Sequence, residues 1–371
     1  MKEKREGLFS HTLSDKDQKK LMIFDLIRKK GSVTRLDISN VTDINLVSIS
    51  NYLKKFLDKK LILETVSPIS TGGRKPEMIE LNTKAANVIG VDIGESEIRL
   101  VMADLALNVV GKVRGAKPAG GKEAIIAASM DLLQQLCGAV KVGMDEILAI
   151  GIGLSVDDDG QLRSAIEAKS GKTTFTGSAA SCAAFGEKKL NLAADVENLL
   201  YMHSDIGCGI VVRGDIYFGA ENVFLRDSRY LGPWATDLRI TEIAKEEIEK
   251  GIGTKMVALT KGSMDNLSLD VVVKAALEQD DIALSILQNT ARNLGIRIAY
   301  LVNLFNPEVV VIGGGMDKAG DIVLDPIRKM VKKYSFKEQA EAVKVIPSSL
   351  GEEAVSIGAA SLTAREMFLK E

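Results

Sequence analysis

The chain has 371 residues, of which 46% are hydrophobic and 26% are charged, and its formal net charge is −2. This length allows two or three domains with cores of their own, and the composition is that of a soluble globular protein rather than a disordered or fibrous one. No apolar run reaches the length of a membrane span, and the charged N-terminus does not resemble a secretory signal, so we expect a cytoplasmic protein without a membrane partner.

The three cysteines, Cys137, Cys182 and Cys208, are scattered along the chain. They show neither the paired spacing of a zinc site nor a disulfide framework. We therefore expect reduced thiols, no bound metal and no cofactor.

Charge is distributed unevenly along the chain. Residues 1–82 carry 16 Lys and Arg against 11 Asp and Glu, about +5, whereas the remainder carries 32 basic against 39 acidic residues, or −7. A basic head on an acidic body predicts that the head, and not the body, contacts a polyanion.

The head begins with two predicted helices. Apolar residues recur at helical spacing over Asp17–Lys30, and Gly31 ends that helix. Thr34 and Asp37 form a capping-box pattern at the start of a second, short helix that ends near Val41.

A third helix and two strands complete the head. Asn45 is expected to cap the third helix, whose buried face consists of Ile49, Leu53, Phe56 and Leu57. Strand-like runs follow at residues 61–66 and 78–81. Three short helices, with a tight turn between the second and third, followed by two strands predict a winged helix-turn-helix.

The third helix is the candidate for contacting DNA bases, because the corresponding helix of this motif enters the major groove with its N-terminal residues against base edges. Asn51 suits adenine and Ser48 suits several bases, whereas lysine and arginine are better placed for phosphates. A solvated polar face, as found on any surface helix, is the alternative. The predicted DNA-binding residues are Arg35, Asn45, Leu46, Val47, Ser48, Ser50, Asn51, Lys54, Lys55, Arg74 and Lys75.

The segment Gly72–Pro76 contributes Arg74 and Lys75 to that set. A flexible and then stiff cationic strip can place arginine in a narrow, A·T-rich minor groove. A hinge with two exposed charges is an equally weighted alternative.

Residues 88–105 predict a β-hairpin, because an apolar run ends in Asp92-Ile93-Gly94, turns through Glu95-Ser96-Glu97 and resumes as an alternating strand. A glycine turn after a strand-end aspartate can bind phosphate and Mg²⁺. An ordinary hairpin with an acidic turn is the alternative, and this stretch alone favours it.

Several stretches together resemble the ROK family, whose name stands for repressor, open reading frame, kinase. The head resembles the family's repressors in D-I-N-L-V-S-I-S-N-Y-L-K-K-F-L-D-K-K-L-I (residues 43–62) and G-G-R-K-P (72–76). The body resembles the family in its first phosphate turn (90–94), in G-I-G-L-S (151–155), in a second phosphate turn and hairpin (205–220) and in N-P-E-V-V-V-I-G-G-G (306–315).

The resemblance covers nearly the whole chain and implies an α/β protein. It implies an N-terminal winged helix-turn-helix followed by two actin-like (RNase H-like) ATPase-fold lobes that face each other across a cleft. The implied domains are residues 1–83 for the head, 84–195 with the C-terminal helix 351–371 for the first lobe, and 196–350 for the second lobe. The implied phosphate-turn residues are Asp92, Gly94, Gly207, Gly209, Gly313 and Gly314.

The chain departs from the family's kinases where the chemistry takes place. Their N-D-x-N-A-A-A-L-G-E motif aligns with residues 178–187, and the aspartate that acts as general base is replaced by Ala179. A methyl group cannot accept a proton, and loss of the base costs a factor of roughly 10² to 10⁴ in rate. Their E-x-G-H motif falls at Arg226-Asp227-Ser228-Arg229, and the zinc-binding cysteines that should follow are absent from 230–237.

Both phosphate turns have gained acidic residues. Glu95 and Glu97 are added to the first, and His203 and Asp205 replace glycine in the second. A carboxylate facing a triphosphate costs about 1 kcal/mol or more. We therefore predict no catalytic residue, no phosphoryl transfer and no tight ATP binding.

Arg226 and Arg229 remain as evidence for a ligand site at the sugar end of the body. Ser178 and Ser181 are nearby in the alignment. Arginine pairs bidentately with carboxylates and phosphates. These four residues form a candidate site for a sugar phosphate or sugar acid. The alternative, which the sequence favours somewhat, is that the arginines neutralise protein carboxylates, with Glu187, Asp205 and Glu221 as candidates.

The sequence thus favours a transcriptional regulator, and more specifically a repressor of carbohydrate-related genes. It would bind a double-stranded, two-fold DNA operator as a homodimer or higher homo-oligomer, with a non-catalytic body that senses a sugar or a sugar-derived anion. The alternatives are an active sugar kinase and a DNA-binding protein whose effector cleft has lost its function.

Overall fold

The computed structural model describes residues 13–66, 76–84, 86–94, 96–154, 160–192, 195–203, 207–217 and 240–370. The chain is an α/β protein, as predicted, and it divides into two compact units. The first consists of Met1–Leu154, Asp158–Gly177 and Ser356–Glu371, and the second of Ser155–Asp157 and Ser178–Val355.

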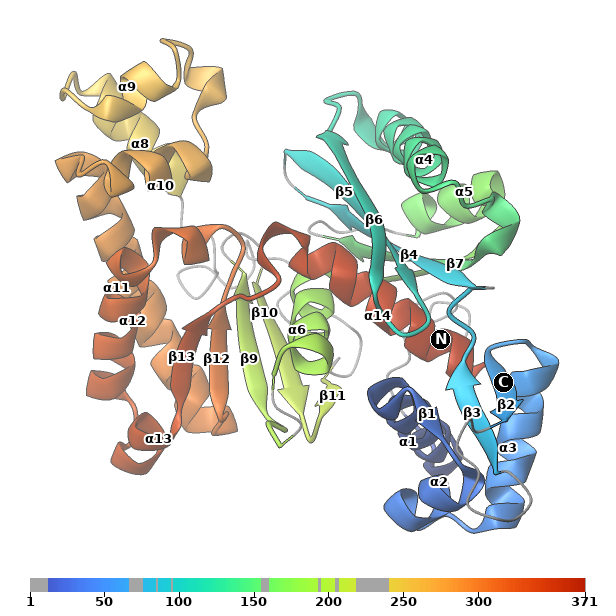
Figure 1. The fold of residues 1–371 in the computed structure, drawn as a ribbon. Helices are drawn as coiled ribbons and strands as arrows, with labels where there is room; N and C mark the ends of the chain where they lie inside the picture. Colours follow the sequence, from blue (N-terminus) through green and yellow to red (C-terminus); the bar gives the residue numbers. More distant parts are fainter. Residues whose placement is uncertain are drawn as a thin grey trace. The chain divides into compact units, whose positions relative to one another are not determined.

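The head lies in the first unit and is a winged helix-turn-helix (Figure 1). Its three-stranded sheet has the order β1-β3-β2. Its elements are α1 (Asp15–Lys30), β1 (Ser32–Val33), α2 (Arg35–Thr42), α3 (Leu46–Asp58), β2 (Ile62–Val66) and β3 (Glu77–Leu81). All three predicted helices and both predicted strands are confirmed, and β1 is an addition.

Side-chain caps explain where the helices of the head begin. Ser14 and Asp17 form a capping box on α1, so this helix begins two residues before the predicted start. The Asp37 amide donates to the Thr34 hydroxyl at 3.0 Å, while the Thr34 amide donates to the Asp37 carboxylate at 2.9 Å. Each cap satisfies backbone groups that the first turn leaves without an intrahelical partner.

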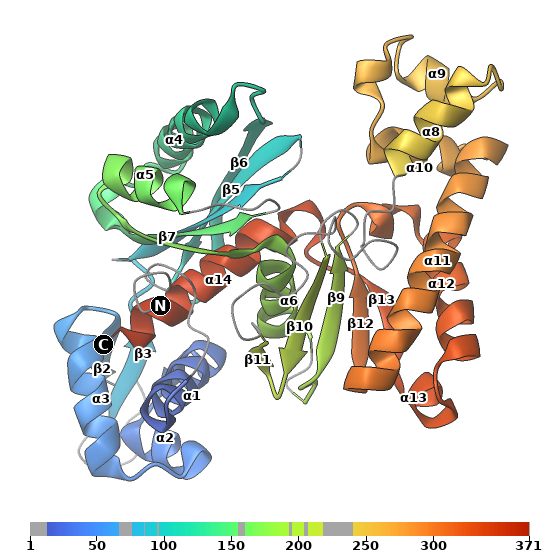
Figure 2. The same cartoon turned by 180° about the vertical axis from the view of Figure 1, so that it is seen from behind.

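The first lobe is built on a five-stranded sheet of order β6-β5-β4-β7-β8. Its strands are β4 (Asn87–Ile93), β5 (Glu97–Asp104), β6 (Val109–Ala116), β7 (Ile147–Leu154) and β8 (Thr173–Ser178). β4, β5 and β6 form an antiparallel meander, which confirms the predicted hairpin, and β7 runs parallel to β4. Figures 1 and 2 show α4 (Gly121–Val140) and α5 (Gln161–Ser170) on one face of this sheet, and α14 (Ala354–Leu369) on the other.

The helix α14 lies unusually close to this sheet. A Cβ atom at Gly90 of β4 would be 1.8 Å from the Ser356 carbonyl oxygen, and one at Gly151 of β7 would be 2.0 Å from the Thr363 hydroxyl oxygen. Only glycine at these two positions leaves room for the helix backbone. Nearly every side chain of α14 is buried, as expected for a helix enclosed by protein.

The second unit repeats the sheet layout of the first lobe. Its sheet has the order β11-β10-β9-β12-β13, again a three-stranded antiparallel meander whose first strand, β9, pairs in parallel with the next strand along, β12. The strands are β9 (Leu199–His203), β10 (Gly207–Val212), β11 (Asp215–Ile216), β12 (Val309–Ile312) and β13 (Lys344–Pro347). Two copies of one layout fit the actin-like lobes that were predicted.

Helices cover both faces of the second sheet (Figure 2). α6 (Ala179–Leu190) packs against β9 and β10, while α11 (Asp281–Phe305) and α12 (Asp321–Tyr334) pack on the other face. The described residues of this unit also form α8 (Ile240–Glu249), α9 (Lys255–Leu259), α10 (Leu269–Leu277) and α13 (Lys337–Ala342), with short 3-10 turns η4 (Met264–Asn266), η5 (Met316–Ala319) and η6 (Gly351–Glu353).

The helix α6 is grouped differently in the compact units and in the predicted lobes. The sequence placed residues 178–195 with the first lobe, whereas α6 groups with the second unit because it packs on β10. A Cβ atom at Gly209 of β10 would lie 2.1 Å from the Ala180 carbonyl oxygen of α6. The division into a head and two lobes at residues 83 and 195 stays a prediction.

Candidate functional site

The helix α3 of the head has two opposite faces. Ile49, Leu53 and Phe56 are completely buried in the core of the head. Ser48 is half-buried, and the exposed face collects the other residues of α3 and its cap that were predicted to contact DNA, namely Asn45, Leu46, Val47, Ser50, Asn51, Lys54 and Lys55. This short, well-packed helix with a polar and basic outer face has the form that major-groove binding requires.

The start of α3 is held by local hydrogen bonds. The Ser48 amide donates to the Asn45 side-chain oxygen at 2.9 Å, which confirms the predicted cap. Asp43 adopts a left-handed conformation, with φ of 56°, and the Ser39 hydroxyl donates to the Ile44 carbonyl at 2.8 Å. Asn45 therefore orients the helix, and its side-chain oxygen is already used in doing so.

Exposed aliphatic side chains occur at the start of α3 and on α2. Leu46 and Val47 are 46% and 73% exposed, and Leu36 and Val41 of α2 are 58% and 63% exposed. Aliphatic groups in a major groove contact the methyl group of thymine. Leu36 and Val41 were missed by sequence analysis, although both lie off the buried face of a predicted helix.

Arg35, one of the residues predicted to contact DNA, forms ion pairs within the head. Its guanidinium donates to Glu77 of β3 at 2.9 Å and pairs with Glu64 of β2. The arginine therefore ties the start of α2 to both strands of the wing, and the two carboxylates already neutralise its charge. The other predicted wing residues, Arg74 and Lys75, lie outside the described residues.

The first phosphate turn is closed by an internal ion pair. Arg99 of β5 donates to the Asp92 carboxylate at 3.4 Å and to Glu97 at 2.6 Å. Asp92 and Arg99 are directly opposite each other in the β4–β5 register, a pairing that the predicted hairpin did not specify. A Cβ atom at Gly94 would lie 3.1 Å from the Glu97 carbonyl oxygen. The residues that would hold phosphate and Mg²⁺ are thus bound to one another.

Asp92 predicts a measurable effect of pH on stability. Burial raises the pKa of its carboxyl to about 7, although Arg99 beside it acts in the opposite direction. Since the folded state holds this proton more tightly than the unfolded state, the stabilisation is complete below about pH 4 and is lost as the pH rises to about 7. The melting temperature of Asp92→Asn, measured relative to that of wild type, should therefore rise as the pH is raised from 5 to 8.

Thermal unfolding at the two pH values measures this gain, with the exposed Asp145→Asn as the control. If both variants show the same difference from wild type at pH 5 and pH 8, the raised pKa of Asp92 is wrong.

Packing or backbone conformation requires glycine at the positions of the other two phosphate turns. Gly209 lies under α6, and a Cβ atom at Gly313 would lie 1.9 Å from the Tyr201 hydroxyl oxygen. Gly314 adopts φ of 68°, which other residues rarely adopt. Gly207 also has a positive φ, of 129°. Packing and backbone conformation are sufficient to explain these residues without a bound phosphate.

The sugar-side motif forms the start of α6. Ala179, in place of the general base, is completely buried, so no side chain that could accept a proton stands there. The Ser178 hydroxyl donates to the Ser181 hydroxyl at 2.9 Å and accepts from the Ser181 amide at 3.1 Å. The structure thus brings the two predicted serines together, as the cap of α6.

Glu187, at the end of the same motif, binds a loop of the second unit. Its carboxylate accepts from the Ser348 and Ser349 hydroxyls at 2.6 and 2.7 Å, and from the Ser349 and Leu350 amides at 2.9 and 3.2 Å. Both carboxylate oxygens are used, so this acid has a structural role that the sequence did not reveal. Arg226 and Arg229, which were considered as partners that neutralise Glu187, lie outside the described residues. Glu95, Asp205 and Glu221 lie outside them as well.

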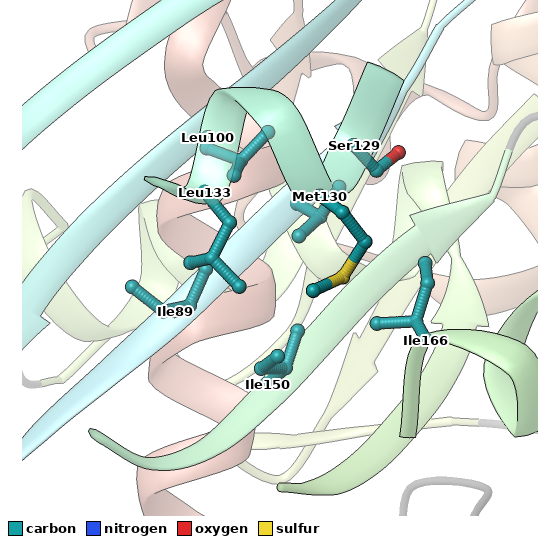
Figure 3. Close-up of a pocket in the computed structure, with 8 residues that line it drawn as sticks. Ile89, Leu100, Ser129, Met130, Leu133, Ile150 and Ile166 are labelled. Atoms are coloured by element: carbon teal, nitrogen blue, oxygen red, sulfur yellow. The ribbon is translucent and has the colours of Figure 1, made fainter. Parts of the chain in front are cut away.

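A narrow void in the first lobe is unsuited to a sugar (Figure 3). It is lined almost entirely by aliphatic side chains of the sheet and α4, with Ile89, Leu133 and Ile150 among them. The single hydroxyl in the lining, that of Ser129, donates to the Ile125 carbonyl of its own helix at 2.8 Å. A polyol needs several convergent polar groups, so the void is a packing space of the core.

Two further findings concern the described residues as a whole. None of their helices is long and apolar enough to cross a membrane. Within the same ranges, no group of three or more His, Cys, Asp and Glu side chains is placed to hold a metal ion.

The chain is similar to regulators over about 95% of its length and to a kinase over 75% of it. Residues 246–366 match the model described as "ROK family". The xylose repressor of Caldicellulosiruptor bescii is 24% identical over 393 residues, which cover 96% of this chain and 98% of that protein.

Two solved structures share the fold. A ROK family transcriptional regulator, described as a homologue of the Escherichia coli MLC protein, superposes with a TM-score of 0.73 at 21% identity, covering 95% of this chain and 96% of its own. A ROK family glucokinase from Streptomyces griseus superposes with a TM-score of 0.64 at 23% identity, covering 75% of this chain and 99% of its own. The regulator therefore matches a larger part of the chain than the kinase does.

Proposed function

We propose that this chain is a transcriptional repressor of carbohydrate-related genes, since residues 246–366 match the ROK family model. It binds a two-fold DNA operator as a homodimer or higher homo-oligomer, and its body responds to a sugar or a sugar-derived anion. The similarity to a xylose repressor over 96% of the chain supports the regulatory role.

The exposed face of α3 is the observation that carries this proposal. It offers an amide, hydroxyls, lysines and aliphatic groups on one side of a helix whose other side is fixed in the core of the head. This combination covers base edges, thymine methyl groups and phosphates together. Phosphorylation of a sugar does not require a surface of this kind.

Selection of binding sequences from random duplex DNA with the full chain tests the proposal. We expect enrichment of a two-fold sequence whose affinity falls steeply between 50 and 200 mM salt, since each lysine on a phosphate releases counterions. Recovery of random sequence only, with no difference between the pool before and after selection, contradicts the proposal.

The body is not expected to phosphorylate sugars. Ala179 removes the general base, and Asp92 of the first phosphate turn is bound to Arg99. Restoring the base with Ala179→Asp should not produce activity, because the turn stays closed. Coupled assays of ATP turnover with a panel of hexoses and pentoses measure this, and sugar phosphate above a no-protein control from either protein overturns it.

The anionic effector is proposed to bind Arg226 and Arg229, with Ser178 and Ser181 as contacts for hydroxyl groups. Two arginines three residues apart in the sequence suit a phosphate or a carboxylate, because a guanidinium group can donate two parallel hydrogen bonds to either. Calorimetric titration of sugars, sugar phosphates and sugar acids should find a ligand whose affinity falls at least about tenfold in the Arg226→Ala/Arg229→Ala variant. Equal affinities in the two proteins reject these residues.

A further inference from the structure

The C-terminal helix ends in the core of the head (Figure 1). Phe368, near the end of α14, is completely buried. Its ring stacks on Phe24 of α1, with centroids 4.1 Å apart and an interplanar angle of 25°, and meets Phe56 of α3 edge-on at 5.0 Å. One aromatic ring from the end of the body therefore joins the first and third helices of the head.

A buried lysine strengthens this contact. Lys20 of α1 is only 2% exposed, and its ammonium donates to the Leu369 carbonyl oxygen at 2.6 Å. Lysine is rarely buried unless it has a partner, and the last carbonyls of a helix favour a positive charge. The last turn of α14 is thus held by the head through both apolar and polar contacts.

The same helix is fixed on the sheet of the first lobe. The close approaches of Gly90 to Ser356 and of Gly151 to Thr363 leave the helix no space to slide or rotate on β4 and β7. A single continuous helix is therefore held by the sheet at its middle and by the core of the head at its end.

We propose that Phe368 is a positioning residue for DNA recognition, which sets the orientation of α3 on the first lobe. This inference rests on the proposed DNA-binding function. Paired recognition helices must match two half-sites about one helical turn, 34–36 Å, apart. A head that can turn on the lobe keeps its contacts with one half-site but loses the fixed separation that favours one operator spacing.

The first experiment measures the orientation of the head without DNA. Spin labels at Asp58→Cys of α3 and Ala168→Cys of α5 report the distance between the head and the first lobe, since both positions are exposed and the three native cysteines are buried. Phe368→Ala should broaden the distance distribution, whereas Phe368→Leu, which keeps an apolar side chain, should restore most of it. Phe336→Ala, which removes a phenylalanine that is 63% exposed, is the matched control.

The second experiment measures the operator spacing. A selected two-fold site is compared with the same site carrying two extra central base pairs and with a single half-site. We expect Phe368→Ala to lose about tenfold or more of the preference for the native spacing, and to bind the half-site within about threefold of wild type. Phe336→Ala should behave as wild type in all three assays.

Loss of half-site binding would reveal that Phe368→Ala prevents the head from folding. In that case Lys20→Met is the second variant that tests the contact. It removes the hydrogen bond to Leu369 but keeps the buried stem, so it should broaden the label distances with the aromatic core intact. Narrow distances in folded Phe368→Ala and in Lys20→Met overturn the inference. If the wild-type chain binds no DNA, the proposed function fails, while the label distances still test the role of Phe368.

Discussion

Replacement of Gly90 by alanine should unfold the first unit or prevent its assembly. The new Cβ atom would lie 1.8 Å from the Ser356 carbonyl oxygen and 2.6 Å from the Ala360 amide nitrogen, both in the backbone of α14. No change of rotamer relieves a clash with backbone, and α14 cannot withdraw without exposing its buried side chains. We expect a loss of roughly 4 kcal/mol or more in the free energy of unfolding.

Gly138→Ala is the matched control for this prediction. Gly138 is an exposed residue inside α4, and a Cβ atom there meets nothing within 4 Å. The same substitution should therefore raise stability by up to about 1 kcal/mol, because alanine favours helix more than glycine does. Urea unfolding of the three proteins separates the two sites, and a Gly90→Ala protein as stable as wild type would mean that α14 does not pack on β4.

Substitution of Asn51 should alter which DNA sequences are bound. Its amide lies on the exposed face of α3, where it can pair with adenine in the major groove. Asn51→Ala should cost about 1–3 kcal/mol on the selected operator and relax the preference at one base pair of each half-site, with little effect on random DNA.

Lys54 supplies the control within the same helix. Lys54 is exposed one turn after Asn51, where its ammonium is suited to a phosphate. Lys54→Ala should weaken operator and random DNA alike and reduce the steepness of the salt dependence by about one unit for each bound copy of the chain. Competition binding on both DNAs tests the pair, and identical behaviour of the two variants would show that α3 does not lie in the groove as assigned.

The elements of the head were predictable because their signals are local. Thr34 with Asp37, and Asn45 with the Ser48 amide, are contacts across three residues, and the sequence pattern contains both partners. The β4–β5 hairpin was likewise visible in its alternation and turn. Its register, which places Asp92 opposite Arg99, was not predicted, because the alternation alone does not fix which residues pair across the turn.

The contacts that were missed join residues far apart in the sequence. The pairs of Arg35 with Glu64 and Glu77 bridge a helix and two strands, and Glu187 binds residues 348–350. An arginine at a helix start has the same local pattern whether it meets a phosphate or a carboxylate. Such choices depend on tertiary packing, which no periodicity in a single sequence contains.

The contact between α1 and α14 also has a consequence for the order of events during synthesis. Lys20 and Leu369 are 349 positions apart, and a ribosome that adds about 5–20 residues per second makes them roughly 20–70 s apart. During that interval the head has emerged, but its core lacks the Phe368 ring. A nascent chain therefore acquires a fixed recognition helix only after both lobes have been made, and a product that stops before α14 should be a poor operator binder rather than a permanently active repressor.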